Sequence, residues 1–285
     1  MARIGIIGGT GLYEMLGVEN VQEIEVKTPF GTPSDKLFIG DFSGKEIVFL
    51  PRHGRKHTIL PSEINYRANI AALKLANVSK IISISAVGSL KEELKPGQMV
   101  VVDQFFDRTN RRKDNTFFGN GMVAHVSFAD PVCEDLRKAI IAAAEKFPET
   151  FHRKGIYVNM EGPAFSTRAE SLFYKTQGFD VIGMTNLVEA KLAREAQMCY
   201  ATIAMVTDYD CWKQEEESVS VEIIIETLKK NAQYSMKVVK EAISIIDPNK
   251  HCQCNESLKY AIVTKMEDVP AETKSKLDFI LKGVK

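Results

Sequence analysis

The sequence predicts an α/β protein whose single domain is built around a mixed or mostly parallel sheet covered by helices. Short apolar runs typical of buried strands alternate along the chain with segments in which apolar residues recur at helical spacing. The chain has 285 residues, 45% of them hydrophobic, which supports a sizeable core. We find no internal repeat and no low-complexity segment, and we therefore favour one large domain over two small ones.

Seven apolar runs are expected to form strands. All are short, as buried strands usually are, and several are rich in isoleucine and valine. In chain order they span residues 3–8, 46–50, 80–85, 99–102, 155–160, 179–184 and 199–206.

Helical patterns lie between several of these runs. The first begins at Ser62, a good N-cap residue after a proline, and the second ends before Pro148. The expected helices span residues 62–75, 131–146, 167–176, 186–197 and, longest of all, 219–246. The stretch 110–121 is long and polar, and we expect a loop there.

Charge and composition exclude several classes of protein. Lysine and arginine number 37, as do aspartate and glutamate, so no excess charge indicates a nucleic-acid or membrane partner. The apolar run at the N-terminus is too short for a signal peptide, and no stretch approaches the roughly 20 apolar residues of a membrane span. We expect a soluble, cytoplasmic protein.

The five cysteines do not form the pattern of a secreted disulfide framework. Only Cys252 and Cys254 have suggestive spacing. With the adjacent His251 they lack a second pair of ligands, so we expect no metal site.

Two loops that follow predicted strands carry groups suited to an anion. The turn at residues 8–11, GGTG, can aim backbone N–H groups at a phosphate, although it lacks the further glycine of a dinucleotide fingerprint and the ending of a P-loop. The run PRHGRKHT places Arg52 and His53 after another strand. The alternatives are a tight structural turn and a solvated basic loop.

Three more strand ends offer small, aromatic or hydroxyl side chains. Ser85 and the small residues after it allow a ligand to approach the backbone. Phe165 can stack on a base, although an isolated phenylalanine is more often part of the core. Thr185 offers a hydroxyl or serves as an N-cap. Together, these loops suit phosphate, sugar and base.

Asp208 and Asp210 follow the apolar run 199–206. The carboxyl ends of strands are where open α/β sheets bind ligands. A carboxyl group facing a purine accepts a hydrogen bond from an exocyclic amine and, when protonated, donates one to N7, which suits adenine better than a 6-oxopurine. The alternative is that both acids cap the next helix or face water.

Taken together, GIIGGTGLYE, PRHGRKHT, NYRANIAALK, SAVGSL, EGPAFSTRAES, GMTNLVEAKLAREAQMCYA and TDYDCW resemble the 5′-methylthioadenosine phosphorylase branch of the trimeric purine nucleoside phosphorylases. The likeness runs from Arg3 to about Ile246. It implies a single α/β domain, residues 1–247, with a mixed and partly barrel-like central sheet. Residues 248–285 are then a C-terminal extension with the CxC pair and one more helix after Pro270, and beyond Tyr260 we expect the chain to depart from the family.

The resemblance implies a role for each matching residue. The phosphate site comprises Thr10, Arg52, His53, Ser85, the backbone of Ala86, and Thr185. Phe165 and Met184 contact base and ribose, Ser166 lies in a specificity-determining segment, and Asp208 and Asp210 bind the purine N7 and N6. His125 resembles a residue that enters the neighbouring subunit's 5′ pocket. The apolar residues that match the 5′-methylthio pocket are Val221, Ile224 and Ile225, which also suit packing of the helix against the sheet.

The reaction implied by the resemblance is that of a pentosyltransferase. Phosphate attacks C1′ of 5′-methylthioadenosine and releases adenine, while Asp208 protonates or hydrogen-bonds N7. No cofactor is needed, since phosphate is a co-substrate. One alternative is a phosphorylase of 6-oxopurine nucleosides or methylthioinosine. A different class, a non-catalytic nucleotide-binding protein, would use the glycine turn alone.

The family also implies a homotrimer, in some members a hexamer of two trimers. Thermophilic archaeal members carry disulfides, and Cys133 and Cys199 match positions that are paired in them. The alternative is free buried thiols. An intracellular disulfide is unusual outside hyperthermophiles.

Overall fold

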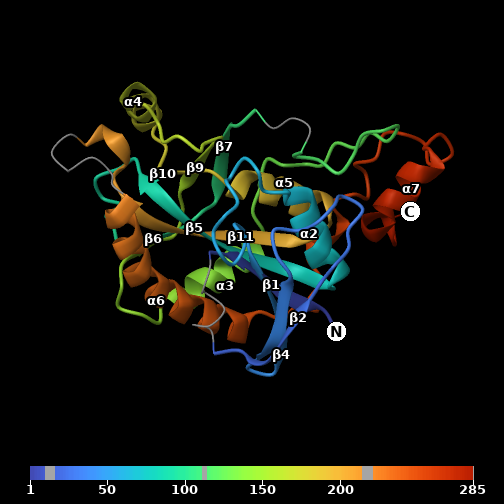
Figure 1. The fold of residues 1–285 in the computed structure, drawn as a ribbon, viewed down its shortest axis with the longest axis horizontal. Coiled ribbons are helices and arrows are strands. Elements are labelled where there is room, and N and C mark those ends of the chain that lie inside the picture. Colours follow the sequence, from blue (N-terminus) through green and yellow to red (C-terminus); the bar gives the residue numbers. More distant parts are fainter. Residues whose placement is uncertain (10–16, 111–113, 214–220, 285) are drawn as a thin grey trace.

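The computed structural model describes residues 1–9, 17–110, 114–213 and 221–284, and near the start of the helix that begins at Val221 it describes mainly the backbone. Figure 1 shows a central sheet with helices on both sides. The elements are, in chain order, β1 (Arg3–Gly8), β2 (Glu19–Ile24), β3 (Leu37–Phe42), β4 (Lys45–Pro51), α2 (Tyr66–Leu75), β5 (Val78–Ser89), β6 (Met99–Val101), β7 (Gln104–Arg108), α3 (Glu134–Ala144), β8 (Phe151–His152), β9 (Ile156–Met160), α4 (Arg168–Thr176), β10 (Val181–Gly183), α5 (Asn186–Glu195), β11 (Cys199–Asp208), the 3₁₀ turn η1 (Asp210–Trp212), α6 (Val221–Ile245), the 3₁₀ turn η2 (Gln253–Glu256) and α7 (Ala271–Leu281).

The described strands form one mixed sheet, which confirms the predicted fold class. Its main path runs β2-β3-β4-β1-β5-β10-β9-β7, and β11 joins it at β5. The pairs β1–β4, β1–β5, β5–β11 and β9–β10 are parallel, whereas β10 runs antiparallel to β5.

The long strand β5 changes neighbours along its length. β1 pairs with it as far as Ser83, and β10 pairs with it only from Gly88 onwards. Ser85 and Ala86 therefore lie in a stretch where, among the described strands, β11 is the neighbour. On the β1 side, none of the described strands pairs with this stretch, which is how an open sheet leaves room for a ligand.

Alternation along the strands sends side chains into two cores. Ile6 of β1 joins the core under α3 and α6, while its neighbour Ile7 joins the core under α2 and α5. Ala201 and Tyr200 of β11 divide in the same way. This two-residue period explains why the strands read as continuous apolar runs, since both faces are covered.

Most predicted elements are present, with small shifts at their ends, but one predicted helix start is wrong. The first helix begins at Tyr66 rather than at Ser62, because Asn65 is the N-cap and its side chain accepts a hydrogen bond from Ala68 N (3.0 Å). The strands β2, β3, β7 and β8 were not predicted.

The C-terminal segment packs on the same domain. α7 begins directly after Pro270, and its Leu277 and Ile280 are buried in the core that also contains α2. A separate extension beyond residue 247 remains a prediction. Within the described residues, no helix is both long and apolar enough to cross a membrane.

Candidate active site

Arg52 lies just beyond β4 and is held by a buried ion pair. Only 3% of its surface is exposed, and Nε and Nη2 both donate to the carboxylate of Glu189, which is 1% exposed. Nη2 also donates to Ser83 Oγ (2.6 Å) and Nη1 to the carbonyl of Ile84 (3.1 Å). Burial alone would lower the pKa of Arg52, but the charge and hydrogen bonds of Glu189 raise it. Its charge is therefore fixed, and its fork is rigidly oriented.

A network of buried hydroxyls and amides continues from this pair. Glu189 also accepts from Ser83 Oγ (2.8 Å) and from the hydroxyl of Tyr200 (2.8 Å). Asn186 donates to the same two groups, at 2.8 and 2.9 Å. The sequence analysis missed these four residues. The available signal was Glu189 itself, because it stands on the apolar face of a helix pattern, where a glutamate needs a partner.

Ser85 and Thr185 lie close to one another at the point where β5 loses β1 as its neighbour. Ser85 Oγ is 3.3 Å from the hydroxyl of Tyr157, and that hydroxyl is also hydrogen-bonded to the backbone of Thr185. Thr185 is the N-cap of α5 by position, but its hydroxyl makes no capping bond and donates to Asn186 Oδ1 (3.3 Å). Two buried hydroxyls beside a helix N-terminus suit an oxyanion.

His53 follows Arg52 and is held as a neutral ring. Its Nδ1 lies 2.8 Å from the carbonyl of Ile59, so Nδ1 carries the proton and Nε2 is left as an acceptor. Burial, together with the charge of Arg52, lowers the pKa of His53 to about 4. At neutral pH, His53 can thus accept a hydrogen bond from the O–H of a phosphate.

Asp208 and Asp210 lie at the end of β11, next to Gly88 of β5. Asp208 Oδ1 accepts from Asp210 N (2.8 Å), and Oδ2 accepts from Thr207 Oγ1 (2.7 Å). A methyl group added at Gly88 would be 3.0 Å from Asp208 Oδ1, so a larger residue here would press on this carboxylate. The carboxyl of Asp210 accepts from Ser171 of α4. Burial raises the pKa of Asp210.

The segment after β9 approaches the same acids. Cys211 Sγ donates to the carbonyl of Ser166 (3.3 Å), which ties this segment to the turn that holds Asp210. Phe165 is 56% exposed, so it belongs to the surface rather than to the core. Gly162 leaves room for Met184, since a Cβ there would be 2.5 Å from its sulfur.

Other predicted site residues are placed elsewhere or lie outside the described part. His125 is exposed, and its N–H donates to the carbonyl of Ala261 (2.8 Å) in the C-terminal segment. In Figure 1 that green loop lies near α7, on the opposite side of the molecule from α4. Thr10 lies outside the described residues, as do the side chains of Val221, Ile224 and Ile225.

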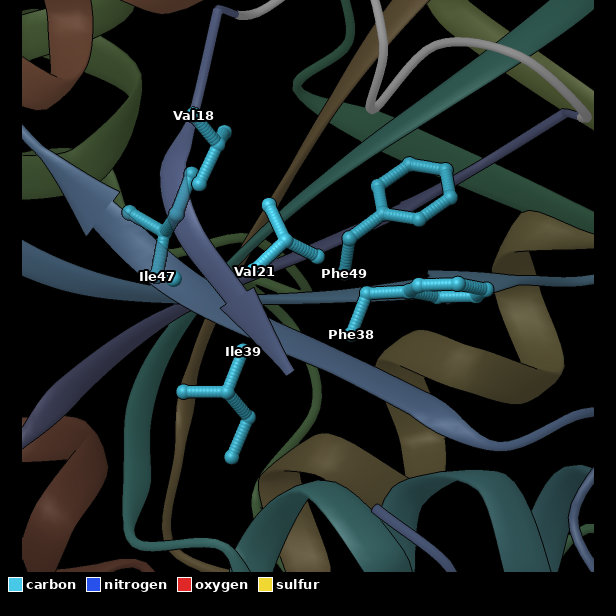
Figure 2. Close-up of a pocket in the computed structure, with 7 residues that line it drawn as sticks. Val18, Val21, Phe38, Ile39, Ile47 and Phe49 are labelled. Atoms are coloured by element: carbon cyan, nitrogen blue, oxygen red, sulfur yellow. The ribbon is translucent and has the colours of Figure 1, made fainter. Parts of the chain in front are cut away.

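A small apolar pocket lies among the outer strands β2, β3 and β4 (Figure 2). Valine, isoleucine and phenylalanine side chains line it, together with one glycine, and Figure 2 shows no polar atom in these side chains. The residues are Val18, Val21, Phe38, Ile39, Gly40, Ile47 and Phe49. A pocket without donors or acceptors does not suit a nucleoside or a phosphate.

The fold and these strand ends are those of a known class of enzymes. Residues 3–244 match the family model described as the phosphorylase superfamily, to which the chain belongs.

The relatives narrow this class. The chain is 55% identical over 278 residues to the S-methyl-5′-thioadenosine phosphorylase of Geobacter sulfurreducens, covering 98% of this chain and 97% of that one. It is 54% identical over 280 residues to the enzyme of the same name from Koribacter versatilis, covering 98% and 96%. Within the superfamily, the chain belongs to the S-methyl-5′-thioadenosine phosphorylase family. Because these alignments cover almost the whole chain, our expectation that the sequence departs from the family beyond Tyr260 was wrong.

Solved structures agree in fold. A methylthioadenosine phosphorylase from an antarctic soil metagenomic library superposes with a TM-score of 0.93 at 47% identity, covering 98% of this chain and 99% of that one. A mutant of the adenosine/methylthioadenosine phosphorylase of Schistosoma mansoni, in complex with methylthioadenosine, gives a TM-score of 0.83 at 39% identity, covering 91% and 96%.

Proposed function

We propose that this protein catalyses the phosphorolysis of 5′-methylthioadenosine, which yields adenine and 5-methylthioribose 1-phosphate. One observation carries the proposal: the oriented cation Arg52 and the acids Asp208 and Asp210 lie at the carboxyl ends of strands on either side of β5. The anion site and the site for the purine edge thus lie at the same edge of the sheet. A nucleoside bound with its base at the acids would place its glycosidic bond between the two sites. The names of the relatives point to the same substrate.

In the proposed mechanism, phosphate binds to Arg52, Ser85, Thr185 and the backbone of Ala86, with His53 accepting its O–H. Thr10 completes this site by resemblance. Phosphate attacks C1′ from the face opposite the base as the glycosidic bond breaks. The ribosyl group becomes oxocarbenium-like, and the phosphate dianion stabilises it electrostatically.

The departing adenine gains electron density, which the two acids receive. Asp208 and Asp210 bind the N7 and N6 edge, and a proton supplied at N7 makes adenine a better leaving group. Burial raises the pKa of Asp210 above the ordinary value of an aspartate. Met184 and Phe165 contact ribose and base, with Ser166 in the specificity segment. By resemblance, Val221, Ile224 and Ile225 are assigned to the methylthio pocket.

Base release measured with and without phosphate tests the proposal. Methylthioadenosine, adenosine, inosine and methylthioinosine are compared at equal concentration. We expect phosphate-dependent release of adenine, fastest from methylthioadenosine. Inosine as the best substrate would instead favour a 6-oxopurine nucleoside phosphorylase. Bound nucleoside without turnover would favour a non-catalytic binding protein.

We further propose that the protein works in the cytoplasm in purine and methionine salvage, as a homotrimer or a dimer of trimers without a resident cofactor. His125 is exposed, and its loop lies near α7, on the other side of the molecule from α4 (Figure 1), which supports a role in a neighbour's 5′ pocket. Light scattering coupled to size-exclusion chromatography gives the oligomeric state. A monomer that retains full activity would overturn the shared site.

A further inference from the structure

Four of the five cysteines meet at one point, at the opposite end of β11 from the acids. The sulfur atoms of Cys133, Cys199, Cys252 and Cys254 all lie within 4.8 Å of one another, with Cys133 Sγ and Cys252 Sγ 3.6 Å apart. Cys133 and Cys199 are buried, and the other two are half-buried. All are free thiols in the structure, so the Cys133–Cys199 bridge implied by the resemblance is not formed.

Backbone and amide hydrogen bonds fix the three segments that carry these thiols. Cys199 begins β11, and Cys133, the residue before α3, donates its N–H to the carbonyl of Tyr200 (2.8 Å). In the C-terminal segment, Asn255 Oδ1 accepts from Cys252 N (2.9 Å), and Asn255 Nδ2 donates to the carbonyl of Gln197 (3.0 Å). The sulfurs are therefore brought together by a scaffold that does not depend on bonds between them.

The separations suit a tetrahedral metal site. Four thiolates about 2.3 Å from a zinc ion lie about 3.8 Å from one another, whereas a disulfide requires about 2 Å. The separation between Cys133 Sγ and Cys252 Sγ, 3.6 Å, is close to the first value, and no two of the four sulfurs are more than 4.8 Å apart. Since every sulfur is within 4.8 Å of the other three, the positions do not select one pair for a disulfide.

Two neighbouring groups carry positive charge or the positive end of a dipole. Lys80 Nζ lies 3.8 Å from Cys199 Sγ, and Cys133 stands at the N-terminus of the 11-residue helix α3. Both offset part of the net charge of −2 that four thiolates and a divalent ion carry. His251 is turned to Glu256 (3.4 Å), so the four sulfurs are the ligand set.

We propose that Cys133, Cys199, Cys252 and Cys254 bind one zinc ion, which fastens the C-terminal segment to the start of β11. Binding releases the thiol protons, and the ion undergoes no redox change. With four protein ligands, zinc keeps no open position for water or substrate, so the site is structural. This corrects our expectation that the CxC pair lacks a second pair of ligands. That pair comes from Cys133 and Cys199, distant in sequence.

Metal analysis of the full chain, purified under reducing conditions, tests the proposal. We expect one zinc per chain by mass spectrometry of the elements, and a lower unfolding temperature after removal with a strong chelator. Cobalt added to the zinc-free protein should give the visible absorption of tetrahedral cobalt thiolate. The cobalt arm uses the unmutated chain, so it does not depend on whether a variant folds.

Two variants separate a bound ion from a chance association. C252S with C254S should abolish the stoichiometric zinc and the cobalt spectrum. The matched control, C211S, removes the cysteine outside the cluster and should keep both. The proposal would be overturned if the protein had five titratable thiols and still gave no cobalt thiolate spectrum. So would two disulfides in the protein, detected as a single free thiol in denaturant before reduction.

Discussion

Arg52 and Glu189 form a buried ion pair that joins the end of β4 to the first turn of α5. Both side chains are almost fully enclosed, at 3% and 1% exposure. Breaking such a pair by removing one partner typically costs about 3–5 kcal/mol, because the other charge remains buried without compensation. The pair thus serves the fold and, in the proposed function, also presents Arg52 to phosphate.

E189Q should lower the free energy of unfolding by about 3 kcal/mol in phosphate-free buffer. Phosphate should then raise the unfolding temperature more in the variant than in the parent protein, because the anion replaces the lost counter-charge. Thermal unfolding across a phosphate series measures this. E195Q, at another buried glutamate of α5, is the matched control. An equal phosphate effect in E189Q and the parent would contradict Arg52 as an anion ligand.

D208N should reduce phosphorolysis of methylthioadenosine by about 100-fold, the usual scale for a lost acid–base group. The remaining activity should shift toward methylthioinosine, since an amide can donate to a 6-oxo group. Steady-state rates with the two nucleosides measure the shift. Phosphate should still raise the unfolding temperature, which shows that the anion site is intact. Unchanged activity on methylthioadenosine would exclude Asp208 from the reaction.

G88A should leave the protein folded but displace the acids. The new methyl group would lie 3.0 Å from Asp208 Oδ1 and 3.2 Å from Asp210 Cβ, both closer than usual. Relief of these contacts needs a shift of a few tenths of an ångström. Since a misplacement of about 1 Å can cost about 100-fold in rate, we expect a smaller loss, up to roughly 10-fold. Activity and thermal unfolding are measured together. Full activity in G88A would mean that these carboxylates need not hold their observed place.

His53 should stay neutral far below the ordinary histidine range. Its pKa in the folded protein is about 4, compared with 6.5 when unperturbed. Because the pKa of His53 is lower in the folded than in the unfolded protein, the neutral ring contributes to the free energy of unfolding above pH 6.5. This contribution is lost as the pH falls through about 4. Proton NMR of the ring, assigned with H53Q, should show no titration near 6.5. A titration midpoint near pH 6.5 would contradict a buried His53 ring that is protonated only at Nδ1.

Glu195 should make stability depend on pH in the opposite sense. Burial raises its pKa from 4.5 to about 7, although Phe117 N and Thr116 Oγ1 both donate to it. The contribution of Glu195 to the free energy of unfolding is fully present below pH 4.5 and is lost as the pH rises through about 7. Its upper limit is about 3 kcal/mol. E195Q should flatten this dependence in urea unfolding. A parallel pH profile in the two proteins would show that Glu195 ionises freely.

The buried strands could be predicted from sequence because both faces of the sheet are covered. β2 could not, because five of its six residues are exposed and its sequence, ENVQEI, is polar as an edge strand can be. β7 ends in exposed residues and was missed for a similar reason.

The candidate site was predictable only in part. Strand-end residues such as Arg52 and Asp208 stand out because charge follows an apolar run. Glu189 stands on the apolar face of a helix pattern, which signals a buried partner, but the sequence does not say that this partner is Arg52. The four-cysteine cluster was missed because two of its members are 119 residues apart, and no local pattern reports such a contact.

The register of β11 constrains how the purine end of the site can vary. This strand is paired with β5 on one side and β6 on the other, and its side chains alternate between two filled cores. A slip by one residue would turn every buried side chain toward the wrong layer. The position of Asp208 along the strand is therefore fixed by the register of β11. Natural variation in base preference must come from exchanging the side chain at this position or reshaping the turn after it, not from moving the strand.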